Sequence, residues 1–234
     1  MNEKIVSLSE ICQIVDCPHS SPKWMTEGIP VIRNFNLVDG TIDDSNLSYV
    51  TVEEYKNRTK RIVPKENDIL FSREAPIGNV AIIPKNFKCC QGQRIVLLRP
   101  ETVKVIPQYL LLALSSNFVK QQINAVSNTG SIVSNFNIKD LQNLLVPLPS
   151  INNQQLIVNA ISGMTSKIAV NKKLINSLES LAKTIYDYWF LQFEFPNEDG
   201  KPYKSSGGKM VWNEELKREI PEGWEVKFLS TVMK

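Results

Sequence analysis

Short apolar runs alternate with turn residues over the first two thirds of the chain. Each run is rich in β-branched or aromatic residues and is bounded by Gly, Pro, Asn or Asp, which is the pattern of strands. The runs are Ile29–Arg33, Asp68–Ser72, Gly78–Ile83 and Arg94–Leu98. A capping box at Thr51–Glu54 opens a short helix, and Pro107–Leu114 begins with a proline followed by strong helix formers. The pattern predicts an α+β fold class, with one mixed globular domain over residues 1–149.

The pattern changes after Pro147-Leu-Pro149, because two prolines one residue apart cannot lie inside a helix. From Ser150, a good N-cap residue, to about Phe190 the sequence has no proline and a single glycine, Gly163. Apolar residues recur there in alternating steps of four and three, as in the seam of a coiled coil. The seam positions are Ile157, Ile161, Met164, Ile168, Asn171, Ile175, Leu178, Ala182, Ile185 and Trp189. We predict one long coiled-coil spacer helix over residues 150–191.

The seam would run for ~50 Å at about 1.5 Å per residue, so a small domain cannot cover all of it. A core helix of an ordinary bundle is the alternative, with Leu174, Leu181 and Tyr188 widening the stripe. Nothing else in the chain is long enough to cover such a stripe, and we therefore favour pairing with another helix. Asn171 either fixes the register of that pair or is tolerated near a hydrated end.

Residues 192–234 have a third character. Phe193–Gly200 and Ser205–Gly208 are rich in turn residues and predict a connector with little core of its own. Ile220–Val226 then begins another apolar run, which resembles the opening of a second domain.

Composition and charge narrow the class of protein only slightly. The chain of 234 residues is 42% hydrophobic and 22% charged, with a net charge of +3, which allows a nucleic-acid partner without requiring one. No apolar run approaches the roughly 18 residues that cross a bilayer, and the N-terminus does not resemble a signal peptide. We expect a cytoplasmic protein without a membrane partner.

The cysteines and the single histidine give no recognisable metal or catalytic motif. Cys12, Cys17, Cys89 and Cys90 do not form a disulfide framework, and Cys17 and His19 lack the second pair of ligands that a zinc site needs. We expect buried thiols, a surface histidine, no metal and no cofactor.

Enzyme motifs are also missing. The sequence contains no phosphate-binding loop, no dinucleotide-binding glycine motif and no zinc-protease helix. A nuclease would need Asp43 or Asp44 to meet Glu54 and Lys56 around a magnesium ion. Glu54 and Lys56 point apart in the predicted helix, so we expect a non-catalytic protein.

The order of these segments resembles the target recognition domain of type I restriction-modification specificity subunits. The resemblance rests on Gly28–Arg33, Asp39-Gly40, Glu66–Ser72, Ile77-Gly78, Gln93-Arg94, Gly130-Ser131, Leu141 and Pro147–Gln155, followed by the long helix, Tyr186–Phe190 and Pro221–Trp224. It covers essentially the whole chain, and it is carried by order and spacing rather than by one motif.

The resemblance implies that the domain binds half of a split site in double-stranded DNA. It also implies that paired antiparallel helices hold two such domains apart and dock methyltransferase (M) subunits, with a restriction (R) subunit as a further partner in DNA methylation and cleavage. Family members usually carry two recognition domains, whereas this sequence holds one. If the resemblance holds, we expect a half-length subunit, a shortened form, or a silent partial copy.

A homodimer would restore two domains. Two chains pairing their seams antiparallel would have twofold symmetry and would bind an interrupted palindrome. With a ~50 Å helix and about 3.4 Å per base pair, the half-sites would lie on the order of 10–15 base pairs apart or fewer.

Recognition of base edges needs Arg, Asn or Gln on loops between strands, with Lys, Ser or Thr on phosphates. The predicted DNA-binding residues are Arg33, Asn34, Asn36, Lys60, Arg61, Ser72, Arg73, Gln91, Gln93, Arg94, Thr129, Ser131 and Lys139. Lys56 and Arg58 are weaker candidates, because Glu53 and Glu54 can pair with them along the helix. The alternative to DNA recognition is an interaction scaffold that binds a protein through the long helix and the aromatic segment Tyr186–Phe193.

Overall fold

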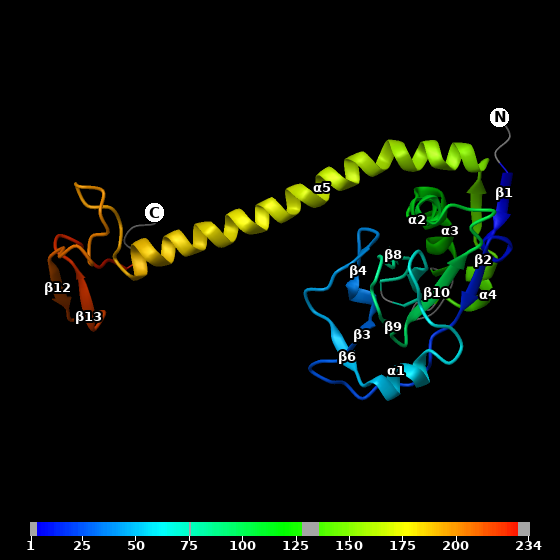
Figure 1. The fold of residues 1–234 in the computed structure, drawn as a ribbon, viewed down its shortest axis with the longest axis horizontal. Coiled ribbons are helices and arrows are strands. Elements are labelled where there is room, and N and C mark those ends of the chain that lie inside the picture. The colour runs from blue at the N-terminus through cyan, green and yellow to red at the C-terminus, as the bar shows by residue number, and fades with distance from the viewer. Residues whose placement is uncertain (1–3, 75, 128–135, 229–234) are drawn as a thin grey trace. The chain divides into compact units, whose positions relative to one another are not determined.

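The computed structural model describes residues 4–74, 76–127 and 136–228. The chain divides into two compact units, Met1–Ser162 and Gly163–Lys234, which are treated separately below. Strands and helices are mixed in the first unit and one long helix follows, so the predicted α+β class is confirmed (Figure 1).

A four-stranded antiparallel sheet forms the centre of the first unit. Its strand order is β2-β10-β7-β8, and β10 pairs with both β2 and β7. Three of its four strands are predicted runs, displaced by one or two residues at their ends. The strands are β2 (Cys12–Val15), β7 (Ile69–Ser72), β8 (Val80–Ile82) and β10 (Ile95–Pro100). Every residue of β7 is buried, which explains the unbroken apolar run Ile69–Phe71.

A second, three-stranded sheet has the order β6-β3-β9. Strand β3 (Ile29–Ile32) pairs antiparallel with β6 (Ser48–Val50) and parallel with β9 (Cys90–Gln91). A short hairpin, β4 (Leu37–Val38) with β5 (Thr41–Ile42), lies between them in sequence.

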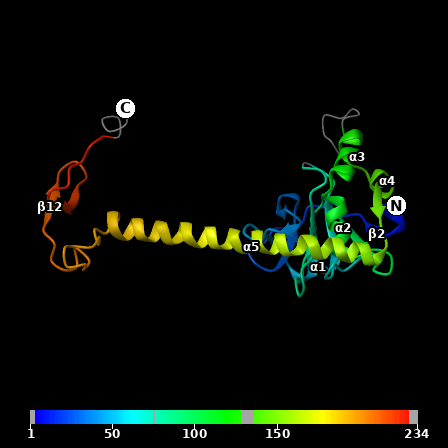
Figure 2. The ribbon, with the colours of Figure 1, turned by 90° about the horizontal axis from the view of Figure 1, so that it is seen from above.

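Helices cover part of these sheets. Thr51 caps the first helix, since its Oγ1 accepts a hydrogen bond from the backbone N–H of Glu54 at 3.2 Å. Figures 1 and 2 both place α4 beside the N-terminal strand, and the backbone N–H of Leu8 donates to Leu144 O at 2.8 Å there. The helices are α1 (Val52–Arg58), α2 (Pro107–Leu114), α3 (Asn117–Ser127) and α4 (Ile138–Gln142), with short 3-10 turns η1 (Leu8–Glu10) and η2 (Asn34–Asn36).

The two ends of the domain meet in a pairing that the sequence did not predict. Strand β1 (Lys4–Ser7) pairs antiparallel with β11 (Leu145–Leu148), with Ile5 opposite Pro147. A proline is tolerated because this sheet has two strands, so each strand has an edge that needs no N–H donor. Pro147, which was predicted to mark the end of the domain, therefore lies in an edge strand.

Two apolar clusters make up most of the core. The larger one joins the helices to one face of the central sheet and includes Phe71 and Phe136, whose ring centroids are 6.1 Å apart. The smaller one lies between the central sheet and the β3 region and includes Ile32 and Leu97. All four cysteines are buried and free, as predicted.

Helix α5 (Ile151–Tyr186) begins against the first unit. Ser150 caps it, with its Oγ accepting from the backbone N–H of Asn153 at 3.4 Å. The Gln154 side chain is completely buried: its Oε1 accepts from Ile106 N at 2.8 Å, and its Nε2 donates to Lys104 O and Pro149 O at 3.3 and 2.9 Å. These bonds fix the first turn of α5 to the domain.

The seam of α5 is exposed. Ile157 is 37% exposed in the first unit; in the second, Met164, Ile168, Ile175, Leu178 and Ile185 are between 41% and 66% exposed. Ile161 is half-buried, and Asn171 and Ala182 are exposed. Coiled-coil pairing stays a prediction.

The second unit holds a small cluster of aromatic side chains, in which Phe193 is buried and Trp224 is 40% exposed. The prediction of a connector with little core stays a prediction. After a π-helical turn, η3 (Asp187–Leu191), the chain forms an antiparallel hairpin of β12 (Met210–Asn213) and β13 (Arg218–Pro221). Trp224 stacks on Phe195 and meets Phe193 edge-on, with centroids 5.4 and 5.5 Å apart. These ring contacts were not predicted, because the aromatic residues are scattered among turn residues in the sequence. None of the helices in the described ranges is both long and apolar enough to span a membrane.

Replacing Gln154 tests the joint at the start of α5. Gln154→Ala leaves the partly buried N–H of Ile106 without its acceptor, and we expect a loss of about 1–3 kcal/mol in the free energy of unfolding. Gln155→Ala is the matched control, since Gln155 is exposed, and it should change stability by less than about 0.5 kcal/mol. Urea denaturation followed by circular dichroism measures both; equal midpoints would contradict the assignment.

Candidate nucleic-acid interface

Parallel pairing of β3 with β9 brings two of the predicted clusters together. Val31 lies opposite Cys90 and Ile32 opposite Gln91, so the residues that follow the two strands emerge side by side. The backbone N–H of Gly92 donates to Ile32 O at 2.8 Å. A Cβ at position 92 would lie 2.7 Å from that same oxygen, so the approach requires glycine.

The two strand ends line a cleft of about 180 Å³, here named the Arg33–Arg94 cleft. Four of its lining residues carry hydrogen-bonding side chains and come from the predicted set. The lining is Pro22, Trp24, Arg33, Asn34, Gly92, Gln93 and Arg94. Arg33, Gln93 and Arg94 are exposed and Asn34 is half-buried, so polar groups of this cleft are accessible.

Arg33 is held by aromatic rings. Its guanidinium carbon lies 5.3 Å from the ring centroid of Trp24 and 4.6 Å from that of Phe35, within the range of a cation–π interaction. Trp24 and Phe35 are 47% and 41% exposed. Neither ring is among the residues predicted to bind DNA. The contact with Phe35 could have been predicted, because Phe35 lies two residues after Arg33. The contact with Trp24 could not, because only the fold brings Trp24 to Arg33.

Gln93 and Arg94 have polar partners at the cleft. Ser21 Oγ donates to Gln93 Oε1 at 2.9 Å. The Arg94 Nε lies 2.8 Å from a carboxylate oxygen of Glu74, with the Arg94 side chain 51% exposed. The cleft therefore carries two guanidinium groups and two amides, with one carboxylate against Arg94.

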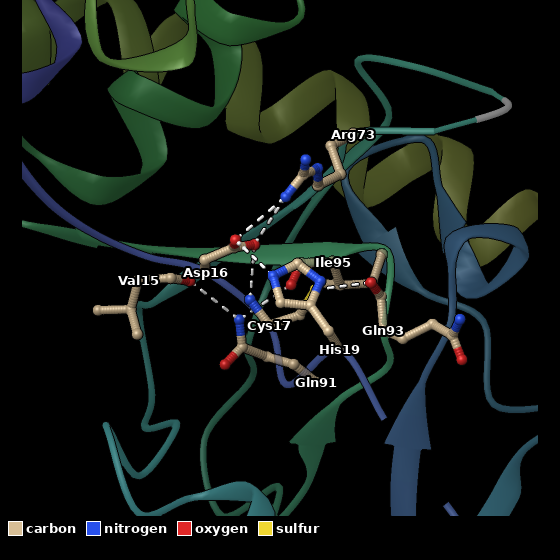
Figure 3. A network of polar contacts seen from close by, with 8 residues as sticks. All are labelled: Val15, Asp16, Cys17, His19, Arg73, Gln91, Gln93 and Ile95. Atoms are coloured by element: carbon tan, nitrogen blue, oxygen red, sulfur yellow. Dashed lines mark hydrogen bonds and ion pairs between the residues drawn. The ribbon is translucent and has the colours of Figure 1, made fainter. Parts of the chain in front are cut away.

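Arg73 is tied to a carboxylate beneath this surface. Its Nη1 donates to both oxygens of Asp16 at 2.9 and 3.1 Å (Figure 3). Burial raises the pKa of Asp16, but hydrogen bonds from Arg73 and Cys17, with the charge of Arg73, outweigh burial and lower the pKa below its ordinary value of 3.8. Asp16 is therefore ionised at neutral pH and holds Arg73 in place. Figure 3 also shows the Gln93 side chain extending away from this network.

The backbone of Arg73 connects the cleft to α4. Its N–H donates to Arg94 O at 3.1 Å, and its carbonyl accepts from Phe136 N at 2.9 Å. Lys139 follows three residues later in α4 and is exposed. The Arg73, Arg94 and Lys139 predictions thus fall on neighbouring segments.

Lys60 and Arg61 follow α1 and are exposed. Arg58, just before them, is buried: it donates to Gln91 O at 2.9 and 3.2 Å and to Ser20 O at 2.9 Å, and lies 3.7 Å from Glu54. Arg58 therefore ties the end of α1 to β9 and to the segment before Pro22, which lines the cleft.

Three predicted residues lie in the interior and bond to the protein itself. Asn36 is 1% exposed and bonds to Arg33 N, Asp43 O and Asn46 O; Ser72 is fully buried and donates to Glu74 O. Gln91 is 3% exposed and donates to Val15 O and Ile95 O. We give these three a structural role and leave them out of the proposed DNA-binding face. Thr129 and Ser131 lie outside the described residues.

The four cysteines lie in the interior of the domain. Burial raises the pKa of Cys12, Cys17 and Cys89 to about 12 and that of Cys90 to about 11, so these thiols stay neutral. Among the residues with described positions, no group of three or more His, Cys, Asp or Glu could hold a metal ion. His19, with its side chain 67% exposed, lies 3.1 Å from Asp16.

Comparison with known proteins gives a consistent family. The model of the type I restriction modification DNA specificity domain matches residues 2–180. The type I restriction enzyme MjaIX specificity subunit of Methanocaldococcus jannaschii is 32% identical over 185 residues, which cover 79% of this chain and 40% of that protein. The EcoBI specificity subunit of Escherichia coli is 29% identical over 151 residues, 64% of this chain and 31% of that one.

A solved structure described as "Structural basis underlying complex assembly and conformational transition of the type I R-M system" has the same fold. Its TM-score is 0.54 at 23% identity, over 78% of this chain and 43% of that chain. The chain thus spans less than half the length of each of these three proteins.

Substituting Gly92 tests the close approach of Gly92 to Ile32 O, beside the cleft. In Gly92→Ala the new methyl group meets a backbone oxygen that cannot rotate away, and we expect a loss of about 1–3 kcal/mol in the free energy of unfolding. Gly163→Ala is the control, because nothing lies within 4 Å of its Cβ position and alanine favours a helix by about 1 kcal/mol. Thermal unfolding measures both; a Gly92→Ala variant as stable as the original protein would contradict the close approach.

Proposed function

The chain belongs to the family of type I restriction modification DNA specificity domains, and from this premise we propose that its N-terminal domain binds double-stranded DNA sequence-specifically. The observation that carries the proposal is the Arg33–Arg94 cleft. There, the side chains of Arg33 and Asn34, which follow β3, lie beside those of Gln93 and Arg94, which follow β9.

The chemistry of the cleft suits base edges. Arginine matches the two acceptors of guanine, and the amides of Asn34 and Gln93 match the donor and acceptor of adenine. The exposed cations Lys60, Arg61 and Lys139 suit phosphates, which orient a protein on the duplex without reading its sequence. The proposed face thus combines base contacts in the cleft with phosphate contacts at Lys60, Arg61 and Lys139.

We further propose that the chain binds DNA without changing it chemically. Its four thiols are neutral and buried, and its one histidine lies on the surface beside Asp16. In this proposal methylation and cleavage belong to M and R subunits that assemble on the chain.

The exposed seam of α5 supports a homodimer. A helix with apolar residues at coiled-coil spacing gains stability by pairing, and antiparallel pairing of two copies gives a twofold axis. Each domain would then bind one half of an interrupted palindrome. Asn171 lies at a seam position and is exposed, so it can bond to a polar group of the partner helix and set the register.

A second candidate is a protein-interaction scaffold. Tyr186, Tyr188, Trp189, Phe190 and Leu191 are 37% to 58% exposed at the end of the long helix. Four of these five residues are large aromatic ones, a type that is frequent in protein interfaces. This candidate needs no working DNA-binding face.

Selection from random duplex DNA separates the two functions. The chain is tested alone and with M subunits, and bound duplexes are sequenced at several salt concentrations. Enrichment of a defined sequence, with affinity falling as salt rises, supports recognition. Binding of M subunits without sequence enrichment supports the scaffold.

Two substitutions should differ in their effects on DNA binding. Arg94→Ala should relax preference at one base position, with a cost of about 1–3 kcal/mol for the selected sequence. Lys60→Ala should weaken all sequences alike and reduce the salt slope by about 1. Fluorescence anisotropy at several salt concentrations measures both, and identical profiles for the two variants would contradict this map of the face.

The dimer can be tested on α5. Ile168→Asp combined with Ile175→Asp places charge in the seam and should give a monomer by light scattering at micromolar concentration, where the original chain gives a dimer. Val170→Asp is the matched control, since Val170 is 64% exposed on the same helix but is not a seam residue. A monomeric original chain, or a control that dissociates equally, would count against seam pairing.

A further inference from the structure

The three arginines near the cleft are held in different ways. Arg73 is paired with Asp16 and Arg94 with Glu74. The Arg33 guanidinium lies over two aromatic rings, and no carboxylate among the residues described here lies within ion-pair distance of it. Its charge is therefore not neutralised by the contacts that position it.

The backbone around Arg33 is fixed from below. Its N–H donates to Oδ1 of Asn36 at 3.0 Å, and Asn36 donates from its Nδ2 to Asp43 O and Asn46 O, each at 3.1 Å. The 3-10 turn Asn34–Asn36 is thereby anchored in the interior, and Phe35 is presented beside Arg33. The buried Asn36 is what orients the first of the two rings.

The second ring comes from a distant segment. Trp24 is tied to the domain through its neighbours: Met25 N donates to Tyr49 O at 3.0 Å, and Ser20 O accepts from the buried Arg58. The two rings therefore reach Arg33 from separately anchored backbones.

A guanidinium that lies over aromatic rings still carries its N–H donors in a planar fork, which can bond to a ligand beside the rings. Two ligands present the paired acceptors that this fork fits, a phosphate and the O6 and N7 edge of guanine. The neighbours in the cleft favour the base. Asn34 and Gln93 are uncharged amides, and the Glu74 carboxylate against Arg94 would repel a phosphate.

We propose that Trp24 and Phe35 are positioning residues that hold Arg33 to recognise a guanine in the major groove of the bound half-site. The inference rests on the proposed DNA binding and adds the base, the recognising residue and its support. The two ring contacts restrict the flexible arginine before DNA arrives, so less conformational entropy is lost when the two hydrogen bonds form.

The experiment uses the sequence selected by the full chain and a set of duplexes with each base pair changed in turn. Arg33→Ala should abolish preference for one G·C pair, a loss of roughly ten-fold or more in the affinity ratio at that position. Arg33→Lys keeps the charge but not the fork and should lose most of the same ratio. Trp24→Ala and Phe35→Ala should each reduce it by roughly two- to ten-fold.

A double variant separates positioning from general damage. In the Arg33→Ala background, Trp24→Ala should have no further effect at that position, because the arginine it positions is gone. Phe35→Tyr keeps a ring and should retain the ratio. Trp212→Ala, which removes another exposed tryptophan, is the control and should change nothing.

The failures are distinguishable. A chain that enriches no sequence defeats the proposed function itself. A selective chain in which Arg33→Ala weakens every duplex equally and lowers the salt slope shows a phosphate contact and overturns the guanine assignment. Additive effects of Trp24→Ala and Arg33→Ala overturn the positioning role.

Discussion

The parallel pairing of β3 with β9 is the contact on which the candidate site depends. Parallel strands cannot be joined by a tight turn, and here the intervening chain supplies β7 and β8 of the central sheet. The chain between β3 and β9 therefore contributes to the core of the same domain. The buried Arg58 reinforces it by bonding to Gln91 O and Ser20 O, which joins β9 to the segment before the cleft. Without this pairing, Arg33 and Arg94 would belong to unrelated loops.

Around the β3–β9 pair, two residues of the same type that lie two positions apart have different roles: one bonds to the interior and the other lines the cleft. Gln91 lies in β9 and donates to two backbone carbonyls in the interior, whereas Gln93 lies beyond the strand and is exposed. Asn36 anchors its turn from within, while Asn34 lines the cleft. Polar residues in such positions are equally good candidates for DNA contact when only the sequence is known. Burial separates them, and burial depends on which face of the turn packs against the sheet.

The sequence predicted the elements whose signals are local. The apolar strands β3, β7, β8 and β10, the Thr51 cap and the α5 pattern each fall within a short stretch, so their residues are sufficient to identify them. The sequence did not predict elements and contacts whose partners lie far away along the chain. Strand β1 is recognisable only from its partner β11 at the other end of the domain, and the aromatic cluster of the second unit depends on Trp224 meeting Phe195. The Trp24–Arg33 contact has the same character, since it joins two separate loops.

The start of α5 shows why a polar joint suits a spacer. An apolar contact tolerates sliding and rotation, because dispersion and burial are not directional. A buried amide that must satisfy its hydrogen bonds has far fewer acceptable positions, since each lost bond leaves a desolvated group. Gln154 bonds to three backbone groups of the first unit, so the first turn of α5 is held in one orientation. In the proposed dimer the seam would join two helices that each begin at such a joint, and the separation of the half-sites would follow from helix length and register.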